Sequence, residues 1–246
     1  MNILNNGLFN LLVSGSVIDA EGWGYYLALS GFVLVSLIAA YLLGSVNSAI
    51  IVSGAFYKED IRTHGSGNAG LTNMLRTYGK GAAGLTLLGD MLKTALAVLF
   101  TALLLGFDYR NGISLNGFCY LAGLLAVIGH IFPIYYGFKG GKGVLATATM
   151  ALVLTPLPFL ILITLFIIIV AITRFVSLGS VCVATLFPFV VFACIKLVSG
   201  VESVPILLNV CTVLLAITVV WCHRANIKRL AKGTESKISF KKKEGK

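Results

Sequence analysis

The chain has 246 residues, of which 58% are hydrophobic and only 11% are charged, and its mean hydropathy is +0.95. Soluble domains carry about 25% charged residues, so this composition excludes an ordinary soluble protein and leaves no room for a separate soluble domain. It predicts an all-α, polytopic integral membrane protein.

The net charge of +10 is concentrated at the C-terminal end. From His223 onward there are nine Lys or Arg residues and two acids, whereas no Lys or Arg precedes Lys58. Because basic residues are retained on the cytoplasmic side, this asymmetry predicts an outside N-terminus and a cytoplasmic C-terminus. Residues 1–24, which include Asp19 and Glu21, lack the basic start of a signal peptide and are expected to form an uncleaved N-terminal extension. Residues 239–246, with Lys241–Lys243, are expected to be a lysine-rich tail near anionic headgroups.

Apolar segments are expected to span the membrane at residues 25–51, 82–106, 115–136, 144–173, 178–198 and 204–221. Residues 144–173 contain Thr155-Pro156-Leu157-Pro158, which favours two short helices in a hairpin over one long tilted helix. The hairpin returns Arg174 to the side of the chain that carries Lys139 and Lys142. It gives about seven transmembrane helices between residues 25 and 238 and places the termini on opposite sides, whereas one long helix would give six.

With seven helices, the polar clusters all fall on the cytoplasmic side, at residues 57–80, 138–143, 174–177 and 223–235. The loops on the other side are short and have few reactive groups. This one-sided accumulation predicts an active site at the cytoplasmic membrane surface.

The first cluster contains the segment Gly65–Arg76, Gly-Ser-Gly-Asn-Ala-Gly-Leu-Thr-Asn-Met-Leu-Arg. It matches a dinucleotide-binding fingerprint in form only, because no strand precedes it and a βαβ unit is excluded. Glycine N–H groups before a helix can still bind an anion, and Arg76 can add a bidentate contact. The candidate phosphate-binding residues are Gly65, Ser66, Gly67, Asn68, Gly70, Thr72, Asn73 and Arg76. The alternative is a glycine-rich interfacial turn with Arg76 as a topology anchor.

The second cluster, Lys139-Gly140-Gly141-Lys142-Gly143, is not a Walker A motif, because Gly137 is one position out and Gly143 stands where Ser or Thr is required. Two lysines that bracket glycines just before a helix starting near Val144 predict an electropositive phosphate cradle. Anchoring by the positive-inside effect is the alternative, but it requires the charges and not the glycines.

The last cluster, His223-Arg224-Ala225-Asn226, places His223 and Asn226 one helical turn apart. The histidine could act as a general base or donate to a phosphate, and interfacial anchoring is again the alternative. The five cysteines lie apart in apolar segments without a Cys-x-x-Cys pair, so neither a disulfide, a metal site nor a cofactor is expected.

Several motifs, in this order, resemble the bacterial acyl-phosphate:glycerol-3-phosphate acyltransferase family over about residues 25 to 238. They are Gly44–Ser48, Asp60–Arg76, Gly129–Pro133, Phe138–Val144, Thr173–Ser177 and His223–Glu235. Asn47, Leu71 and Leu145 depart from the usual pattern without touching a charged group.

The resemblance implies transfer of a fatty acyl group from acyl phosphate to glycerol 3-phosphate, giving lysophosphatidic acid and phosphate in the first acylation step of phospholipid biosynthesis. It implies a seven-helix fold in the bacterial inner membrane with the site on the cytoplasmic face. It also implies that the site contains Ser66, Arg76, Lys139, Ser177, His223 and Asn226. Membrane lipid and a soluble enzyme that makes acyl phosphate are candidate partners, and nucleic acid is not expected.

Two substrates with phosphate groups would require two anion cradles. An acyl phosphate has a good leaving group, so direct attack by the 1-hydroxyl needs positioning and charge stabilisation but no enzyme nucleophile. The proton would pass to a substrate phosphate oxygen or to His223. The competing hypothesis is a transporter for a small phosphate-bearing anion, although transporters usually place broken helices near the midplane and often contain internal repeats, and neither is evident here.

Overall fold

The computed structural model describes residues 3–18 and 22–238; Asp19, Glu21 and the predicted tail at 239–246 lie outside the described residues. The helices are α1 (Ile3–Ser14), α2 (Trp23–Ser45), α3 (Ser48–Val52), α4 (Leu71–Thr77), α5 (Lys80–Leu105), α6 (Gly117–Ile131), α7 (Val144–Leu154), α8 (Pro156–Thr173), α9 (Val176–Cys194), α10 (Ile206–Cys222) and α11 (Arg224–Ala231). Short π-helical or 3₁₀ turns occupy Ser53–Tyr57, Ile61–Thr63, Ile134–Tyr136 and Ile195–Ser199, and the strands β1 (Tyr109–Arg110) and β2 (Ile113–Ser114) form one hairpin.

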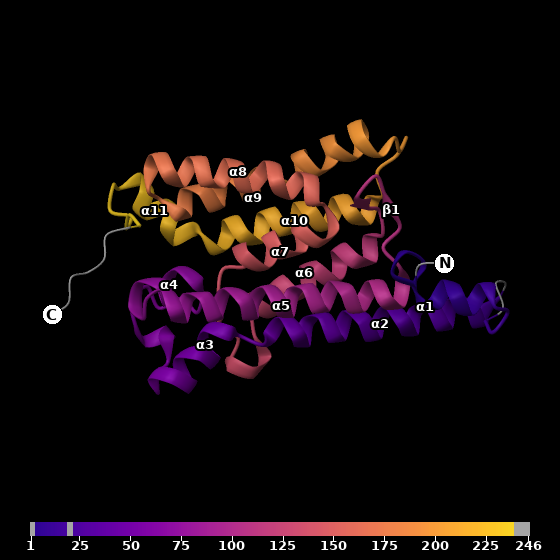
Figure 1. Ribbon diagram of the computed structural model, residues 1–246, viewed down its shortest axis with the longest axis horizontal. Coiled ribbons are helices and arrows are strands. Elements are labelled where there is room, and N and C mark those ends of the chain that lie inside the picture. The colour runs from indigo at the N-terminus through magenta and orange to yellow at the C-terminus, as the bar shows by residue number, and fades with distance from the viewer. Residues whose placement is uncertain (1–2, 19–21, 239–246) are drawn as a thin grey trace.

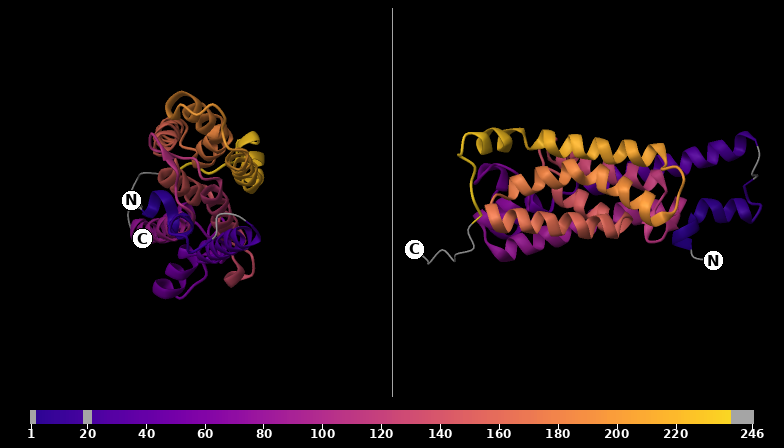
Figure 2. Two further views of the ribbon diagram at one scale, coloured as in Figure 1. Left: turned by 90° about the vertical axis from the view of Figure 1, so that its right-hand side faces the viewer. Right: turned by 90° about the horizontal axis from the view of Figure 1, so that it is seen from above.

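The long helices form an elongated bundle with α4 and α11 at one end and α1 and the β-hairpin at the other (Figure 1). Helix α2 packs on α5 and α6, α9 packs on α8 and α10, and α7 contacts α5, α6 and α8. Helices α1 and α11 lie at opposite ends of the bundle, which is also seen from above in Figure 2. The predicted all-α membrane class is confirmed.

Within residues 3–18 and 22–238, five stretches are long and apolar enough to cross a membrane, and a sixth is added if α10 and α11, bent by 56°, are counted as one span. Helix α7 has eleven residues and extends about 16 Å, about half of the hydrocarbon thickness. The predicted break in residues 144–173 is confirmed, since α7 ends at Leu154 and α8 starts with Pro156, a position that tolerates proline. Seven membrane crossings and the sidedness of the termini stay predictions.

Three local expectations were incomplete. The first long helix ends at Ser45, because the extended backbone at Val46 and Asn47 breaks it and the Asn47 side chain caps α3 by accepting from the Ile50 N–H at 3.1 Å. The expected turn near residue 110 is a β-hairpin around Asn111-Gly112, whose positive φ angles of 46° and 79° suit a tight hairpin turn. The N-terminal extension contains α1, which packs on α5.

Helix α6 is held against α2 by small residues. A Cβ atom on Gly44 would lie 2.2 Å from the carbonyl oxygen of Ala126, and one on Gly129 would lie 2.4 Å from that of Tyr41. Only glycine permits this backbone approach, which is typical of membrane helix pairs. It brings the C-terminal end of α6 next to the α2–α3 break.

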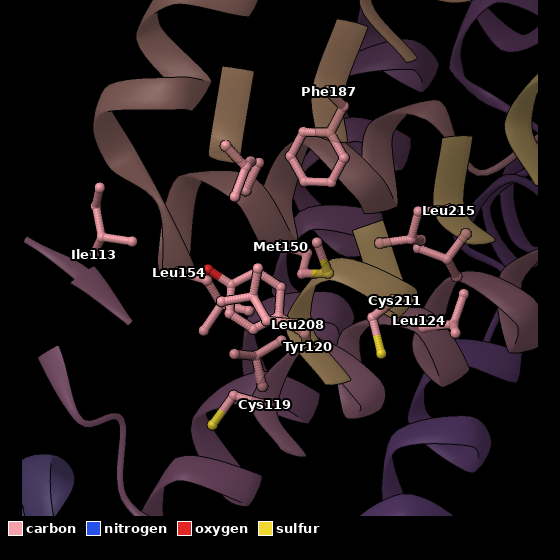
Figure 3. Packing of buried hydrophobic residues seen from close by; sticks show 14 of the residues in the cluster. Ile113, Cys119, Tyr120, Leu124, Met150, Leu154, Phe187, Leu208, Cys211 and Leu215 are labelled. Atoms are coloured by element: carbon pink, nitrogen blue, oxygen red, sulfur yellow. The ribbon is translucent and has the colours of Figure 1, made fainter. Parts of the chain in front are cut away.

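The main apolar core lies between α6, α7, α9 and α10 (Figure 3). It includes the side chains of Tyr120, Met150, Phe187, Leu208 and Leu215. The Tyr120 hydroxyl donates to the Ser114 carbonyl at 3.0 Å, so its one polar group is paired. Packing of this kind fixes the positions at which the polar loops leave the bundle.

Candidate active site

The Gly65–Arg76 segment is shaped by the side chain of Asn73, which is 2% exposed. Its Nδ2 donates to the carbonyl oxygens of Ile61, His64 and Asn68 at 3.0–3.3 Å, and its Oδ1 accepts from the Ser66 N–H at 3.0 Å. The side-chain amide of Asn73 therefore forms its hydrogen bonds with the backbone of the loop. This loop-ordering role was not anticipated, and its expected contact with phosphate stays a prediction.

Two glycines of this segment have the conformation that the loop needs. Gly65 and Gly67 have φ angles of 58° and 69°, and a Cβ on Gly65 would lie 2.2 Å from Asn73 Oδ1. The segment then enters α4, which starts at Leu71 and carries Arg76 in its last turn. A helix thus follows the glycine-rich turn directly, which is the arrangement that would favour anion binding.

A buried ionic cluster lies beneath this segment. Lys93 Nζ lies 2.9 Å from Asp90 Oδ1 and 3.0 Å from His130 Nδ1, and it donates to the Val46 carbonyl at 2.5 Å. The Asp90 and Lys93 side chains are 1% and 5% exposed. Asp90 also accepts from the Ser48 N–H at 3.4 Å. The cluster connects the α2–α3 break to α5 and α6, and pairing offsets part of the cost of burying its charges.

The Lys139–Gly143 loop is arranged differently from the expected cradle. The N–H groups of Gly140 and Gly141 donate to the carbonyls of Ile131 and His130 at 3.0 and 3.1 Å. These bonds satisfy carbonyl groups at the end of α6. A Cβ on Gly141 would lie 2.0 Å from His130 Nε2, so close packing accounts for this glycine.

The two lysines of this loop have different surroundings. Lys139 is exposed, whereas Lys142 is partly buried and its Nζ lies 2.5 Å from Asn226 Oδ1. Burial, followed by the charge of Arg229, lowers the pKa of the Lys142 ammonium group below its ordinary value, although Glu235 opposes this. Lys142 is thus the loop lysine that the fold turns towards the other polar cluster.

The break between α10 and α11 supplies His223 and Asn226. His223 is 3% exposed, and its Nδ1 lies 2.7 Å from the Val219 carbonyl, a contact that requires the hydrogen on Nδ1. In the neutral ring, Nε2 is then the atom that can accept a proton.

Glu235 binds three residues of the site. Its carboxylate accepts from Ser177 Oγ at 2.8 Å, Asn226 Nδ2 at 2.7 Å and Arg229 Nε at 2.7 Å. Burial raises the pKa of Glu235, but these hydrogen bonds outweigh burial and leave the pKa below its ordinary value. Glu235 thereby joins the start of α9 to α11.

These elements enclose a cavity of about 600 Å³ that has a polar and an apolar part. The polar part, here called the mouth, is lined by Gly65, Ser66, Asn68, Gly70, Thr72, Asn73, Arg76, Asp90, His130, Lys142, Gly143, Ser177, His223, Asn226, Arg229 and Glu235. The apolar part, here called the arm, lies between α7, α8 and α9 and is lined by Ala148, Ala151, Phe159, Leu162, Ile163, Phe166, Val183, Ala184 and Phe187. A charged mouth that continues into an apolar arm fits an amphipathic ligand.

Most of the predicted site residues meet in the mouth. Among the predicted residues, Gly67, Lys139, Gly140 and Gly141 do not line the cavity. Asp90, His130, Arg229 and Glu235 line it without having been predicted. The spacing of Asp90 and Lys93 on one helix face could have indicated the ionic cluster, and the one acid within the basic stretch 223–235 could have indicated Glu235.

Comparison with known proteins agrees with this geometry. The family model described as glycerol-3-phosphate acyltransferase matches residues 34–233. A glycerol-3-phosphate acyltransferase of Halalkalibacterium halodurans is 42% identical over 212 residues, which cover 86% of this chain and 97% of that protein. A glycerol-3-phosphate acyltransferase of Clostridioides difficile is 41% identical over 212 residues, which cover 85% of this chain and 97% of that protein.

Two crystal structures of PlsY (YgiH), an integral membrane glycerol 3-phosphate acyltransferase, are similar at 28% identity. Its glycerol 3-phosphate form gives a TM-score of 0.72 and covers 84% of this chain and 96% of that chain. Its lysophosphatidic acid form gives a TM-score of 0.71, and the match covers 84% of this chain and 95% of that chain. The chain described here belongs to the glycerol-3-phosphate acyltransferase family and is an integral membrane acyltransferase.

Proposed function

We propose that the cavity transfers a fatty acyl group from acyl phosphate to glycerol 3-phosphate and forms lysophosphatidic acid and phosphate. The observation that carries this proposal is the continuity of a cationic mouth and an apolar arm in one cavity. The similar crystal structures are described as glycerol 3-phosphate and lysophosphatidic acid forms, which are one substrate and the product of this reaction.

The mouth has the groups that two phosphates require. Arg76 can bind phosphate through two N–H groups, and Lys142 supplies a second positive charge at the opposite loop. Ser66, Ser177 and Asn226 add neutral polar groups. We propose Lys142, rather than the exposed Lys139, as the cationic contact of the second loop.

The arm suits the acyl chain. Along α8 it extends from Phe159 to Phe166, seven residue steps or about 10 Å, between apolar side chains. Burying a chain there would gain about 0.8 kcal/mol for each CH₂ group. A phosphate held in the mouth would then place the reacting acyl carbon near the junction with the arm.

The chemistry needs no covalent enzyme intermediate. The 1-hydroxyl oxygen of glycerol 3-phosphate forms a bond to the acyl carbon, and the bond from that carbon to the phosphate oxygen breaks. The hydroxyl proton passes to a phosphate oxygen of the donor or to Nε2 of His223. Lys142 and Arg76 stabilise the charge on the departing phosphate.

We further propose that the protein lies in the inner membrane of a bacterial cell and that its mouth opens on the cytoplasmic side. Helix α4, which carries Arg76, and the basic helix α11 lie at the same end of the bundle (Figure 1), and Lys142 lines the same mouth, as the positive-inside rule predicts for a cytoplasmic end. The basic surface of α11 is a candidate docking place for a soluble enzyme that makes acyl phosphate.

The test uses the purified full chain in nanodiscs with glycerol 3-phosphate and palmitoyl phosphate. We expect one lysophosphatidic acid and one phosphate for each acyl phosphate consumed. Formation of lysophosphatidic acid from palmitoyl-CoA but not from palmitoyl phosphate would show that acyl phosphate is not the acyl donor. Glycerol 3-phosphate uptake into proteoliposomes without any acylated product would favour transport instead. The variants Lys139→Cys and Glu202→Cys each introduce one cysteine into a loop. Labelling of these cysteines in intact cells would report which end of the bundle faces the cytoplasm.

A further inference from the structure

Thr147, in the first turn of α7, has a buried hydroxyl without a hydrogen-bond partner. The residue is 9% exposed and lines the cavity, and its Oγ1 is the one buried side-chain oxygen or nitrogen without a partner in the described part of the chain. An unpaired buried hydroxyl has lost its hydrogen bonds to water without replacing them and therefore destabilises the ligand-free protein. A ligand that supplies an acceptor would remove this destabilisation.

The unpaired state is unusual for a threonine in this bundle. Threonine hydroxyls in helices can donate to the carbonyl four residues earlier. Thr94, Thr149 and Thr185 do so at 2.9–3.0 Å. Thr149 is two residues away on the same helix and is also buried. The Thr147 hydroxyl is therefore free to interact within the cavity.

Thr147 lies where the mouth meets the arm. Lys142 and Gly143 precede it at the mouth, and Ala148 and Ala151 follow it along the arm. The Ser180 hydroxyl, which also lines the cavity, is already paired with the Val176 carbonyl at 2.9 Å. Thr147 thus offers a neutral hydrogen-bond donor at the junction between the mouth and the arm.

We propose that the Thr147 hydroxyl donates a hydrogen bond to the carbonyl oxygen of the acyl group, in the bound acyl donor and in the ester product. This inference rests on the proposed function, because it requires the phosphate in the mouth and the chain in the arm. In both molecules the carbonyl lies between the phosphate-bearing part and the chain, as Thr147 lies between mouth and arm. No bond is made or broken by Thr147, which binds and orients the reacting group.

The first test compares Thr147→Val, Thr147→Ser and the control Thr149→Val in the nanodisc assay. Valine keeps the shape and removes the hydroxyl, whereas serine keeps a hydroxyl. We expect Thr147→Val to lower kcat/KM for palmitoyl phosphate about tenfold, the value of one hydrogen bond. Thr147→Ser and Thr149→Val should remain within about threefold of the wild type. Equal activity of the two valine variants would overturn the proposal.

The second test uses a ligand without the carbonyl. The ester 1-palmitoyl-glycerol 3-phosphate and its ether analogue 1-hexadecyl-glycerol 3-phosphate differ at this group. The wild type and Thr149→Val should bind the ester about tenfold more tightly than the ether, and Thr147→Val should bind both equally. A wild-type ratio near one, measured without any variant, would overturn the proposal.

Stability separates this role from a structural one. Because valine removes an unpaired polar group at nearly constant shape, ligand-free Thr147→Val should unfold at the same temperature as the wild type or higher. Reduced activity with a lowered unfolding temperature would indicate damage to the fold and count against the proposal. Failure of the proposed function itself would look different, since the wild type would then neither turn over acyl phosphate nor bind the ester.

Discussion

The Nζ atom of Lys142 lies 2.5 Å from Oδ1 of Asn226, although the two residues are 84 positions apart in the sequence. Lys142 lies near the end of the loop between α6 and α7, and Asn226 belongs to α11. Asn226 in turn donates to Glu235 at 2.7 Å. This chain of contacts joins two of the polar clusters and fixes the lysine that the mouth uses.

Replacement of Lys142 by methionine should therefore lower activity far more than replacement of Lys139. Methionine keeps the apolar stem but removes the charge, and one charge-assisted hydrogen bond is worth about 1.5–3 kcal/mol. We expect Lys142→Met to lower kcat/KM roughly 10- to 100-fold, and Lys139→Met to change it less than about threefold. Phosphate release from palmitoyl phosphate measures both. A larger loss in Lys139→Met would restore Lys139 as the essential lysine.

The same lysine should set the alkaline limit of activity. Burial, and then the charge of Arg229, lower the pKa of Lys142 from the ordinary lysine value of 10.5. Phosphate binding needs the protonated form, so kcat/KM should fall as the pH rises through a value below 10.5. In Lys142→Arg the guanidinium stays charged, so the alkaline fall should move to higher pH or vanish. Lys139→Arg, the control, should keep the wild-type profile, and an unchanged profile in Lys142→Arg would exclude Lys142 as the titrating group.

Local chemistry made much of the architecture predictable. The prolines at 156 and 158 indicated the α7–α8 break because proline cannot continue the hydrogen bonding of a helix interior. The gathering of Arg76, His223 and Asn226 followed from placing the charged loops on one side. In both inferences, each residue determines the structure or the placement of the segment that contains it.

Contacts between distant segments were not predictable in the same way. Lys139 and Lys142 flank the same glycines, and only the hydrogen bonds from Gly140 and Gly141 to the end of α6 decide which lysine faces inward. Thr147 and Thr149 likewise look equivalent in the sequence, because an unpaired hydroxyl is visible only when its surroundings are known.

The Gly65–Arg76 segment should lose its shape when Asn73 is replaced by alanine. The change removes the bonds to the carbonyls of Ile61, His64 and Asn68 and the acceptor for the Ser66 N–H. We expect activity to fall more than about tenfold and the Ser66 amide to exchange its hydrogen faster, since buried backbone groups lose their partners.

Thr72→Ala is a suitable control for Asn73→Ala, because Thr72 also lines the mouth and no hydrogen bond from its side chain holds the loop among the described residues. Its amide exchange across residues 61–70 should match the wild type. If Asn73→Ala kept wild-type exchange and lost only activity, Asn73 would be a substrate contact and its loop-ordering role would be wrong.

The arm should set the length of acyl chain that the enzyme accepts. Ala151 lines the arm one helical turn beyond Thr147, and a phenylalanine there would fill space that a long chain needs. We expect Ala151→Phe to lower kcat/KM for palmitoyl phosphate relative to decanoyl phosphate by about tenfold, because about two buried CH₂ groups would lose their place at about 0.8 kcal/mol each. Leu152→Phe is the matched control, since Leu152 is 38% exposed and does not line the cavity. The ratio of the two kcat/KM values cancels any general loss of folded enzyme, so an unchanged ratio in Ala151→Phe would place the acyl chain outside the arm.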